Sequence, residues 1–259
     1  MSLYLGIDLG TQGVKALVFD ADAKRVVARA GRALPAPESP RPGAAEQNPA
    51  DWWDGFVAAA QEALAMDGVE RARVRAIGVS GQQHGMVVLD ENDEVLHPAK
   101  LWCDVEPEEE ARALSEASGR AVAPGFTAPK LVWLKKHHPD LFARVAKLQL
   151  PHDWLNGRLT GNHATDAGDA SGNGIFDPIA RTHDLQAAAW IDARVPDMLP
   201  PILVANEAHG TLLPEVAQLL DLSTDVRVSA GSGDNMMSAL GAGAFDPELL
   251  VISLGTSGT

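Results

Sequence analysis

The chain has 259 residues, 46% of them hydrophobic, and its 35 acidic and 21 basic residues give a formal net charge of -14. This composition can build a hydrophobic core in one large domain or two small ones, whereas the negative charge disfavours nucleic acid as a partner. Cys103 is the single cysteine, which excludes an intrachain disulfide and a cysteine-based zinc site and is typical of a cytoplasmic protein. Neither a membrane-spanning stretch nor a signal-peptide pattern is present in the sequence, so we expect no membrane partner.

The first third of the chain predicts an antiparallel meander. Predominantly apolar runs at 3–9, 14–20 and 25–34 predict three strands, which are separated by a glycine-bounded turn and by the polar segment DADAK. Residues 35–49 are rich in proline, which cannot donate a backbone hydrogen bond, and they predict a surface loop.

A helix is predicted directly after this loop. Asn48 is a good N-cap, Pro49 suits the first helical position, and Asp51 adds an acidic residue to the first turn. We expect the helix to run to about Met66 and to present one apolar face, formed by Trp53, Phe56, Val57, Ala60 and Leu64.

The remainder of the chain alternates between predicted strands and predicted helices. We predict further strands at 74–81, 226–231 and 249–253, a hairpin over 85–96 that turns at 91–93, and helices at 106–118, 127–137 (capped by Thr127), 214–220 and 235–244. The meander must be antiparallel, whereas the later strands need crossover connections. The pattern therefore predicts an α/β domain with a mixed sheet flanked by helices.

Two distant segments share one pattern. LGIDLGTQG begins at Leu5 and VISLGTSGT begins at Val251, and each is an apolar strand followed by Leu-Gly-Thr-x-Gly. Such a turn can hold a phosphate with backbone N–H groups, although an ordinary hairpin turn is the commoner meaning. Asp8 favours the phosphate site, because a carboxylate in an apolar strand is costly unless a cation such as a hydrated Mg²⁺ lies beside it.

Three other segments carry polar groups at the ends of predicted strands. Asp234 lies in GSGDN, where it can cap a helix or accept a hydroxyl proton. Gln82, Gln83 and His84 lie between glycines, where they are ordinary loop residues or partners for sugar hydroxyls. Trp102 in LWCD is a core residue or a flat apolar face for a sugar ring or chain.

Together these segments resemble the FGGY family of carbohydrate kinases along essentially the whole chain, and most closely its xylulose-phosphorylating members. The resemblance rests on GIDLGTQGVKALVFD, GVSGQQHGMVVLD, GFTAPKLVWLKKHHPDLF, LPHDWLNGRLTG, TDAGDASGNGIFD, GSGDNMMSALGAG and VISLGTSGT. It implies an actin-like ATPase, ribonuclease H-like fold. It also implies that residues 1–246 form the sugar-binding N-terminal domain and that residues 247–259 form the first strand and phosphate turn of a second, nucleotide-binding domain.

The resemblance also implies roles for individual residues. Asp234 matches the catalytic aspartate that takes the proton from the sugar hydroxyl, and Asp8 matches the residue that positions Mg²⁺. The substrate-binding positions are Gln83, His84, Trp102, Asp104 and Asn235. The turn positions near the transferred phosphate are Gly10, Thr11 and Gln12, and those facing the nucleotide phosphates are Gly255 and Thr256.

The expected reaction is the transfer of phosphate from ATP to D-xylulose, a small-molecule sugar, which gives D-xylulose 5-phosphate. Cys103 stands where many members of the family have Asn, so another ketose, a polyol or a sugar acid is an alternative substrate. A non-catalytic sugar-binding module is the alternative from a different class. Because the adenosine-binding part of the second domain lies outside these 259 residues, we expect this chain alone to transfer no phosphate; an apolar docking face left exposed could also drive formation of a homodimer.

Overall fold

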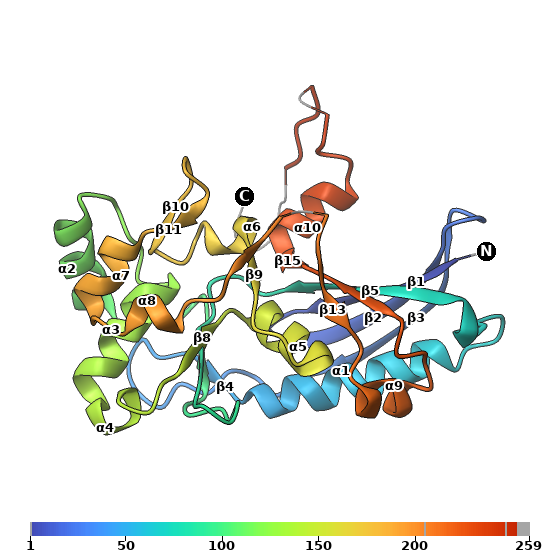
Figure 1. Cartoon of the computed structure of the whole chain (residues 1–259), viewed down its shortest axis with the longest axis horizontal. Helices are drawn as coiled ribbons and strands as arrows, with labels where there is room; N and C mark the ends of the chain where they lie inside the picture. Colours follow the sequence, from blue (N-terminus) through green and yellow to red (C-terminus); the bar gives the residue numbers. More distant parts are fainter. Residues whose placement is uncertain (1, 205, 247, 253–259) are drawn as a thin grey trace.

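A computed structural model of the chain describes residues 2–204, 206–246 and 248–252. Within them, a sheet with helices against it forms one lobe and a cluster of helices forms the other, as Figure 1 shows. The predicted meander is confirmed: β1 (Leu3–Leu9) pairs antiparallel with β2 (Gly13–Asp20), which pairs antiparallel with β3 (Arg25–Ala33).

The rest of the sheet makes it mixed, as the sequence predicted. Strand β5 (Val74–Gly81) runs parallel to β1, and β14 (Arg227–Ser229) and β15 (Ser232–Gly233) both run parallel to β5. Strand β13 (Ala208–Thr211) pairs antiparallel with β14, so the order is β13-β14-β5-β1-β2-β3 with β15 beside β5. The sequence predicted one strand over residues 226–231, but β14 ends at Ser229. Gly231 adopts a left-handed φ of 73° and turns the backbone into β15.

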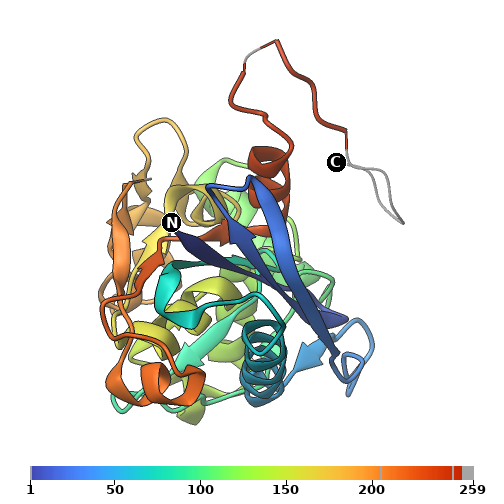
Figure 2. The same cartoon turned by 90° about the vertical axis from the view of Figure 1, so that its right-hand side faces the viewer.

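One face of the sheet is covered by helices. The alternate β1 residues Leu3, Leu5, Ile7 and Leu9 are buried on this face, as the two-residue period of a strand requires. Helix α1 (Pro49–Leu64) packs against them, with α9 (Pro214–Leu220) and α5 (Pro151–Thr160) beside it. Figure 2 shows α1 and α10 (Asp234–Gly241) on opposite sides of the sheet.

The predicted cap of α1 is confirmed, because the Asn48 side chain accepts a hydrogen bond from Ala50 N at 3.0 Å. Its predicted apolar face is partly wrong. Trp52 is fully buried, whereas Trp53 and Val57 are only half-buried. The face is rotated toward Trp52 because that indole packs edge-on against Trp154 of α5, with ring centroids 5.8 Å apart.

The helical lobe has its own core. It consists of α2 (Glu108–Ser118), α3 (Thr127–His137), α4 (Pro139–Phe142), α7 (Leu185–Ile191) and α8 (Val195–Met198), which pack around β6 (Val87–Leu89) and β8 (Lys147–Gln149). The N-cap of α3 is Phe126 rather than Thr127. The predicted hairpin is also incomplete, because β6 takes β8 as its strand partner and meets the returning arm only at a bridge between Leu89 and Val95.

Short elements complete the described chain. They are β4 (Glu46–Gln47), which pairs with β7 (Ala99–Lys100), β9 (Thr165–Asp166), which pairs with β12 (Ile202–Leu203), β10 (Phe176–Asp177), which pairs with β11 (Thr182–His183), α6 (Ala167–Ala170) and the 3-10 turn Arg71–Arg73. Residues 35–48 therefore form the predicted loop except at β4 and at an isolated bridge from Glu38, and Pro49 already begins α1. None of the helices in the described ranges is both long and apolar enough to cross a membrane.

The strand predicted at 249–253 is wrong for the part that the structure describes. Residues 249–252 have no strand conformation, and Leu250 and Ile252 are 81% and 63% exposed. A strand exists only beside a hydrogen-bonding neighbour, and none of the described sheet strands pairs with this apolar run. Residue 253 lies outside the described residues.

Candidate active site

The candidate site lies where the parallel strands β1, β5 and β15 end. Leu9 and Gly233 both pair with Gly81 of β5, so the three strands end at the same level. The segments that follow them are Gly10 to Gln12, Gln82 to His84, and Asp234 with Asn235. The topology therefore brings together predicted site residues that lie up to about 225 positions apart in the sequence, at the edge of the sheet where α/β proteins bind ligands.

The turn after β1 is held by polar contacts. Gly10 N donates to Gly13 O at 3.1 Å, and Thr11 Oγ1 donates to Gln82 Oε1 at 2.7 Å. Trp102 Nε1 donates to Thr11 Oγ1 at 3.1 Å, which places the indole beside the turn with 47% of the residue exposed. Gln12 is exposed. Gln82 is 1% exposed and links the turn to the loop after β5.

Asp234, Asn235 and Gln83 lie together at the start of α10. Asn235 Nδ2 donates to Gln83 Oε1 at 2.8 Å, and Asn235 N donates to Asp234 Oδ1 at 2.7 Å. An added Cβ at Gly233 would lie 2.5 Å from Gln83 Cγ, so the pair needs a glycine there. Burial raises the pKa of the Asp234 carboxyl, and the negative charges of Asp8 and Asp169 act in the same direction, against the hydrogen bond from Asn235 N.

Asp8 stands on the face of the sheet opposite α1. Its carboxylate is 41% exposed, pairs with Lys15 Nζ at 3.3 Å and lines a groove of about 600 Å³ that also contacts Leu17 and Met237. The charge of Asp8 reaches Asp234 strongly enough to raise its pKa. An accessible carboxylate whose charge acts on a second one fits a hydrated Mg²⁺, whose positive charge would relieve that repulsion.

His84 adopts a left-handed backbone, with a φ of 57°. Its carbonyl oxygen accepts hydrogen bonds from Thr127 Oγ1 at 3.1 Å and from Lys130 Nζ at 2.7 Å, which fix this uncommon conformation. Lys130 is fully buried, and burial lowers its pKa to about 7. The His84 ring lies 5.2 Å from the Phe126 ring and 3.5 Å, through Nδ1, from Asp169 Oδ1.

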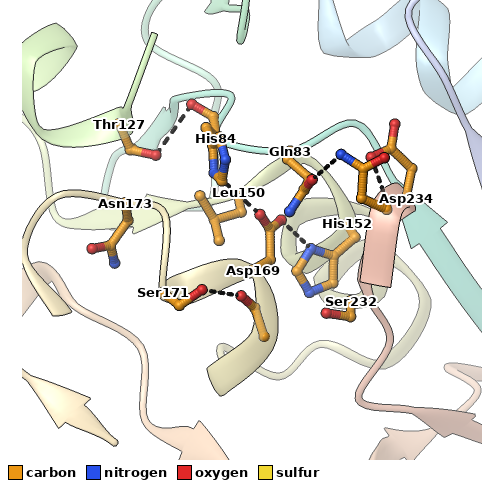
Figure 3. Close-up of polar contacts among 12 residues, drawn as sticks. Gln83, His84, Thr127, Leu150, His152, Asp169, Ser171, Asn173, Ser232 and Asp234 are labelled. Carbon is orange, nitrogen blue, oxygen red and sulfur yellow. Dashed lines mark hydrogen bonds and ion pairs between the residues drawn. The ribbon is translucent and has the colours of Figure 1, made fainter. Parts of the chain in front are cut away.

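A buried charged group behind His84 was missed by the sequence analysis. His152 of α5 is 0% exposed, and its Nδ1 lies 3.0 Å from Asp169 Oδ2 while its Nε2 lies 2.9 Å from Asp153 Oδ1 and 3.3 Å from Asp166 Oδ1 (Figure 3 shows His152 and Asp169). Burial opposes protonation, but the charge of Asp153 and hydrogen bonds to the three aspartates raise the pKa of His152 well above 6.5.

This group connects the two sides of the site. Asp169 reaches His84, whereas Asp166 accepts a 2.8 Å hydrogen bond from Ser232 Oγ, two residues before Asp234. The residues belong to LPHDW and TDAGDASG, where one histidine and three aspartates stand in otherwise small or apolar surroundings. That composition was the available indication, but two of the three aspartate partners, Asp166 and Asp169, are 14 and 17 residues away from His152.

Asp104 is not brought to the open part of the site. It is fully buried, where Ala45 N donates to Oδ2 at 2.9 Å and Lys100 Nζ lies 2.9 Å from the same oxygen. Lys100 Nζ also contacts Glu46 at 3.3 Å and Glu106 at 2.7 Å. The described geometry makes Asp104 an anchor for the loop that carries Trp102. The predicted nucleotide-side residues Gly255 and Thr256 lie outside the described residues.

Residues 3–241 match the model of the N-terminal domain of the FGGY family of carbohydrate kinases. The chain therefore belongs to this family, whose resemblance the sequence motifs had already indicated, and its fold is the actin-like ATPase fold of sugar kinases.

Individual relatives are xylulose kinases. The chain is 40% identical to the xylulose kinase of Haemophilus influenzae over 278 aligned residues, which cover 99% of this chain and 55% of that protein. It is 38% identical to the xylulose kinase of Escherichia coli, with coverage of 99% and 53%. The chain thus spans about half the length of the curated relatives it matches.

Solved structures share the fold of this chain. A Brucella ovis protein described as a xyloylose kinase superposes with a TM-score of 0.91 at 39% identity, covering 99% of this chain and 54% of that one. The gluconate kinase of Lactobacillus acidophilus superposes with a TM-score of 0.89 at 24% identity, covering 99% of this chain and 53% of that one, a likeness of fold alone.

Proposed function

We propose that this chain supplies the sugar-binding half of a kinase that transfers phosphate from ATP to D-xylulose and forms D-xylulose 5-phosphate. The observation that carries the proposal is the placement of Asp234 at the shared end of three parallel strands, beside the amide pair of Gln83 and Asn235. The identity to xylulose kinases along 99% of the chain supports xylulose as the sugar.

Asp234 acts as the general base in this proposal. Its carboxylate accepts the proton of the sugar hydroxyl as that oxygen attacks the phosphorus atom, and the raised pKa makes it a better proton acceptor than an exposed aspartate. Gln83 and Asn235 hydrogen-bond sugar hydroxyls, His84 bonds a further hydroxyl, and Trp102 packs its half-exposed indole against the carbon chain.

The phosphate side of the site is assigned to the turn after β1. Asp8 would hold Mg²⁺, and Gly10, Thr11 and Gln12 would lie near the transferred phosphate. When bound, ATP with Mg²⁺ supplies the phosphoryl group and neutralises its charge. We assign residues 1–246 to the sugar-binding domain and 247–259 to the start of the nucleotide-binding domain, so that complete phosphoryl transfer requires both.

The test is a calorimetric titration of this chain with D-xylulose, D-ribulose, glycerol and gluconate. Because half of a cleft makes only part of the contacts, we expect D-xylulose to bind with a Kd on the order of 1 mM, or about -4 kcal/mol. Asp234→Asn should weaken binding roughly 5- to 30-fold, as expected for a lost charge-assisted hydrogen bond worth about 1 to 2 kcal/mol. The matched control is Asp54→Asn on the exposed side of α1, which should bind as the wild type does.

Each outcome discriminates between alternatives. Preferential binding of another compound in the panel would replace xylulose by that ketose, polyol or sugar acid. Equal weakening by Asp234→Asn and Asp54→Asn would remove Asp234 from the sugar site. Failure of every compound to bind at protein concentrations above 1 mM would contradict the sugar-binding role of this half.

A further inference from the structure

The buried group formed by His152 and its aspartates has no role in the proposed reaction, yet it ends at the sugar-binding loop. Two contacts link the group to this loop: His152 Nδ1 lies 3.0 Å from Asp169 Oδ2, and Asp169 Oδ1 lies 3.5 Å from His84 Nδ1. His152 and Asp169 are both fully buried. Figure 3 shows the three side chains in one line between α5 and the loop after β5.

His152 determines which oxygen of Asp169 faces His84. Three carboxylates surround the imidazole of His152 and favour its protonated form: Nδ1 donates to Asp169 Oδ2, and Nε2 lies at ion-pair distance from Asp153 and Asp166. Asp169 Oδ1 and His84 Nδ1 both belong to the buried polar atoms that have no hydrogen-bond partner within the described residues. Two buried polar atoms that lack partners and lie 3.5 Å apart need only a small movement to form a hydrogen bond with one another.

The neutral form of His84 has one donor and one acceptor nitrogen. Burial lowers the pKa of His84 below 6.5, Lys130 acts in the same direction and Asp169 opposes them, so the ring is neutral at pH 7.5. Because a carboxylate oxygen only accepts, the proton of the neutral ring belongs on Nδ1. Nε2 makes no hydrogen bond within the described chain, and the side chain remains 22% exposed.

We propose that Asp169, held from behind by His152, is a positioning residue that fixes His84 in the Nδ1–H tautomer. Nε2 of His84 is then a hydrogen-bond acceptor, and the substrate atom that faces it is a hydroxyl, which donates, rather than a carbonyl oxygen, which cannot. This specificity rule rests on the proposed sugar-binding function, whereas the tautomer itself does not.

The test begins with the tautomer. The chain labelled with ¹⁵N-histidine is examined by long-range ¹H–¹⁵N correlation NMR at pH 7.5, and the His84 signals are assigned with His84→Gln. We expect Nδ1–H and bare Nε2 in the wild type. Asp169→Asn should invert the tautomer, because the amide oxygen must accept from His152, so the amide NH₂ group faces His84 and donates to Nδ1.

Asp153→Asn is the matched control. It removes a buried carboxylate from the same histidine, 2.9 Å from Nε2, without contacting His84, so it should leave the His84 tautomer unchanged. The two variants should also differ in D-xylulose titrations, with roughly tenfold weaker binding for Asp169→Asn only, as for one hydrogen bond of about 1.4 kcal/mol.

The outcomes separate the two proposals. An Nε2–H tautomer in the wild type would overturn the positioning role even if Asp169→Asn failed to fold. The role would equally be overturned if Asp169→Asn kept the wild-type tautomer, or if Asp153→Asn changed it as much. The expected tautomers in a chain that binds no sugar would support the positioning role and overturn the sugar-binding function, together with the hydroxyl rule that rests on it.

Discussion

Gly172 offers a selective way to displace one side chain of the candidate site. It follows α6, its φ lies outside the left-handed region, and an added Cβ would overlap Cε1 of His84 and lie 2.5 Å from Nδ1 and 2.7 Å from Nε2. A comfortable contact needs about 3.5 Å, so Gly172→Ala must push the imidazole away by more than about 1 Å. Hydrogen-bond lengths span only about 0.5 Å, so this movement should break the hydrogen bond that we propose between His84 and a sugar hydroxyl.

The expected loss is therefore about 1 to 2 kcal/mol of binding free energy, or roughly 5- to 30-fold in the Kd for D-xylulose. Calorimetric titration measures it, and Gly31→Ala in β3 is the control because its Cβ would make an ordinary 3.6 Å contact with Val14 O. Unchanged affinity in Gly172→Ala, with NMR showing that the His84 ring has moved, would refute the assignment of His84 to the sugar site.

Three further predictions concern stability and are measured by urea denaturation. Lys100→Met should lower the free energy of unfolding by about 3 to 5 kcal/mol because it leaves buried carboxylates without their ammonium partner. Lys147→Met, which removes an ion pair with the exposed carboxylate of Asp93, should change it by less than about 1 kcal/mol. Trp52→Ala should cost about 3 to 5 kcal/mol through the cavity it leaves, and the half-exposed Trp190→Ala about 1 kcal/mol or less. His152→Gln should be more destabilising at pH 6 than at pH 9: the raised pKa of His152 gives stability that is complete below its unfolded value near 6.5 and is lost as the pH rises through the folded value. A deficit that grows toward pH 9 would contradict that sign.

The elements that the sequence predicted well are those whose pattern is local. Strand β1 alternates between the α1 face and the open face, α1 has a capping asparagine followed by proline, and α9 has a proline at its start. Helix α5 was missed for a physical reason. Eight of its ten residues are buried, so it lacks the polar face that makes a helix visible as a period of 3.6.

The candidate site likewise has a part that the sequence predicts and a part that it does not. Asp8, Gln83, His84 and Asp234 stand directly after or within strands, so their convergence follows from the parallel topology. The identity of the sugar-facing side chains does not follow from such spacing. Asp104 was expected beside the sugar, but a neighbouring backbone amide and the Lys100 ammonium hold it inside the protein, and neither contact has a sequence pattern.

Lys100 has a consequence for how the protein depends on its surroundings. Oxygens of Glu46, Asp104 and Glu106 lie within 4.8 Å of one another, a spacing at which proteins often hold a metal ion, and here the ammonium group contacts all three. A cation that is covalently part of the chain cannot be chelated, diluted or exchanged for a competing ion. The loop that carries Trp102 is thus held by ion pairs that need no metal ion, and a chelator such as EDTA should leave this part of the fold intact.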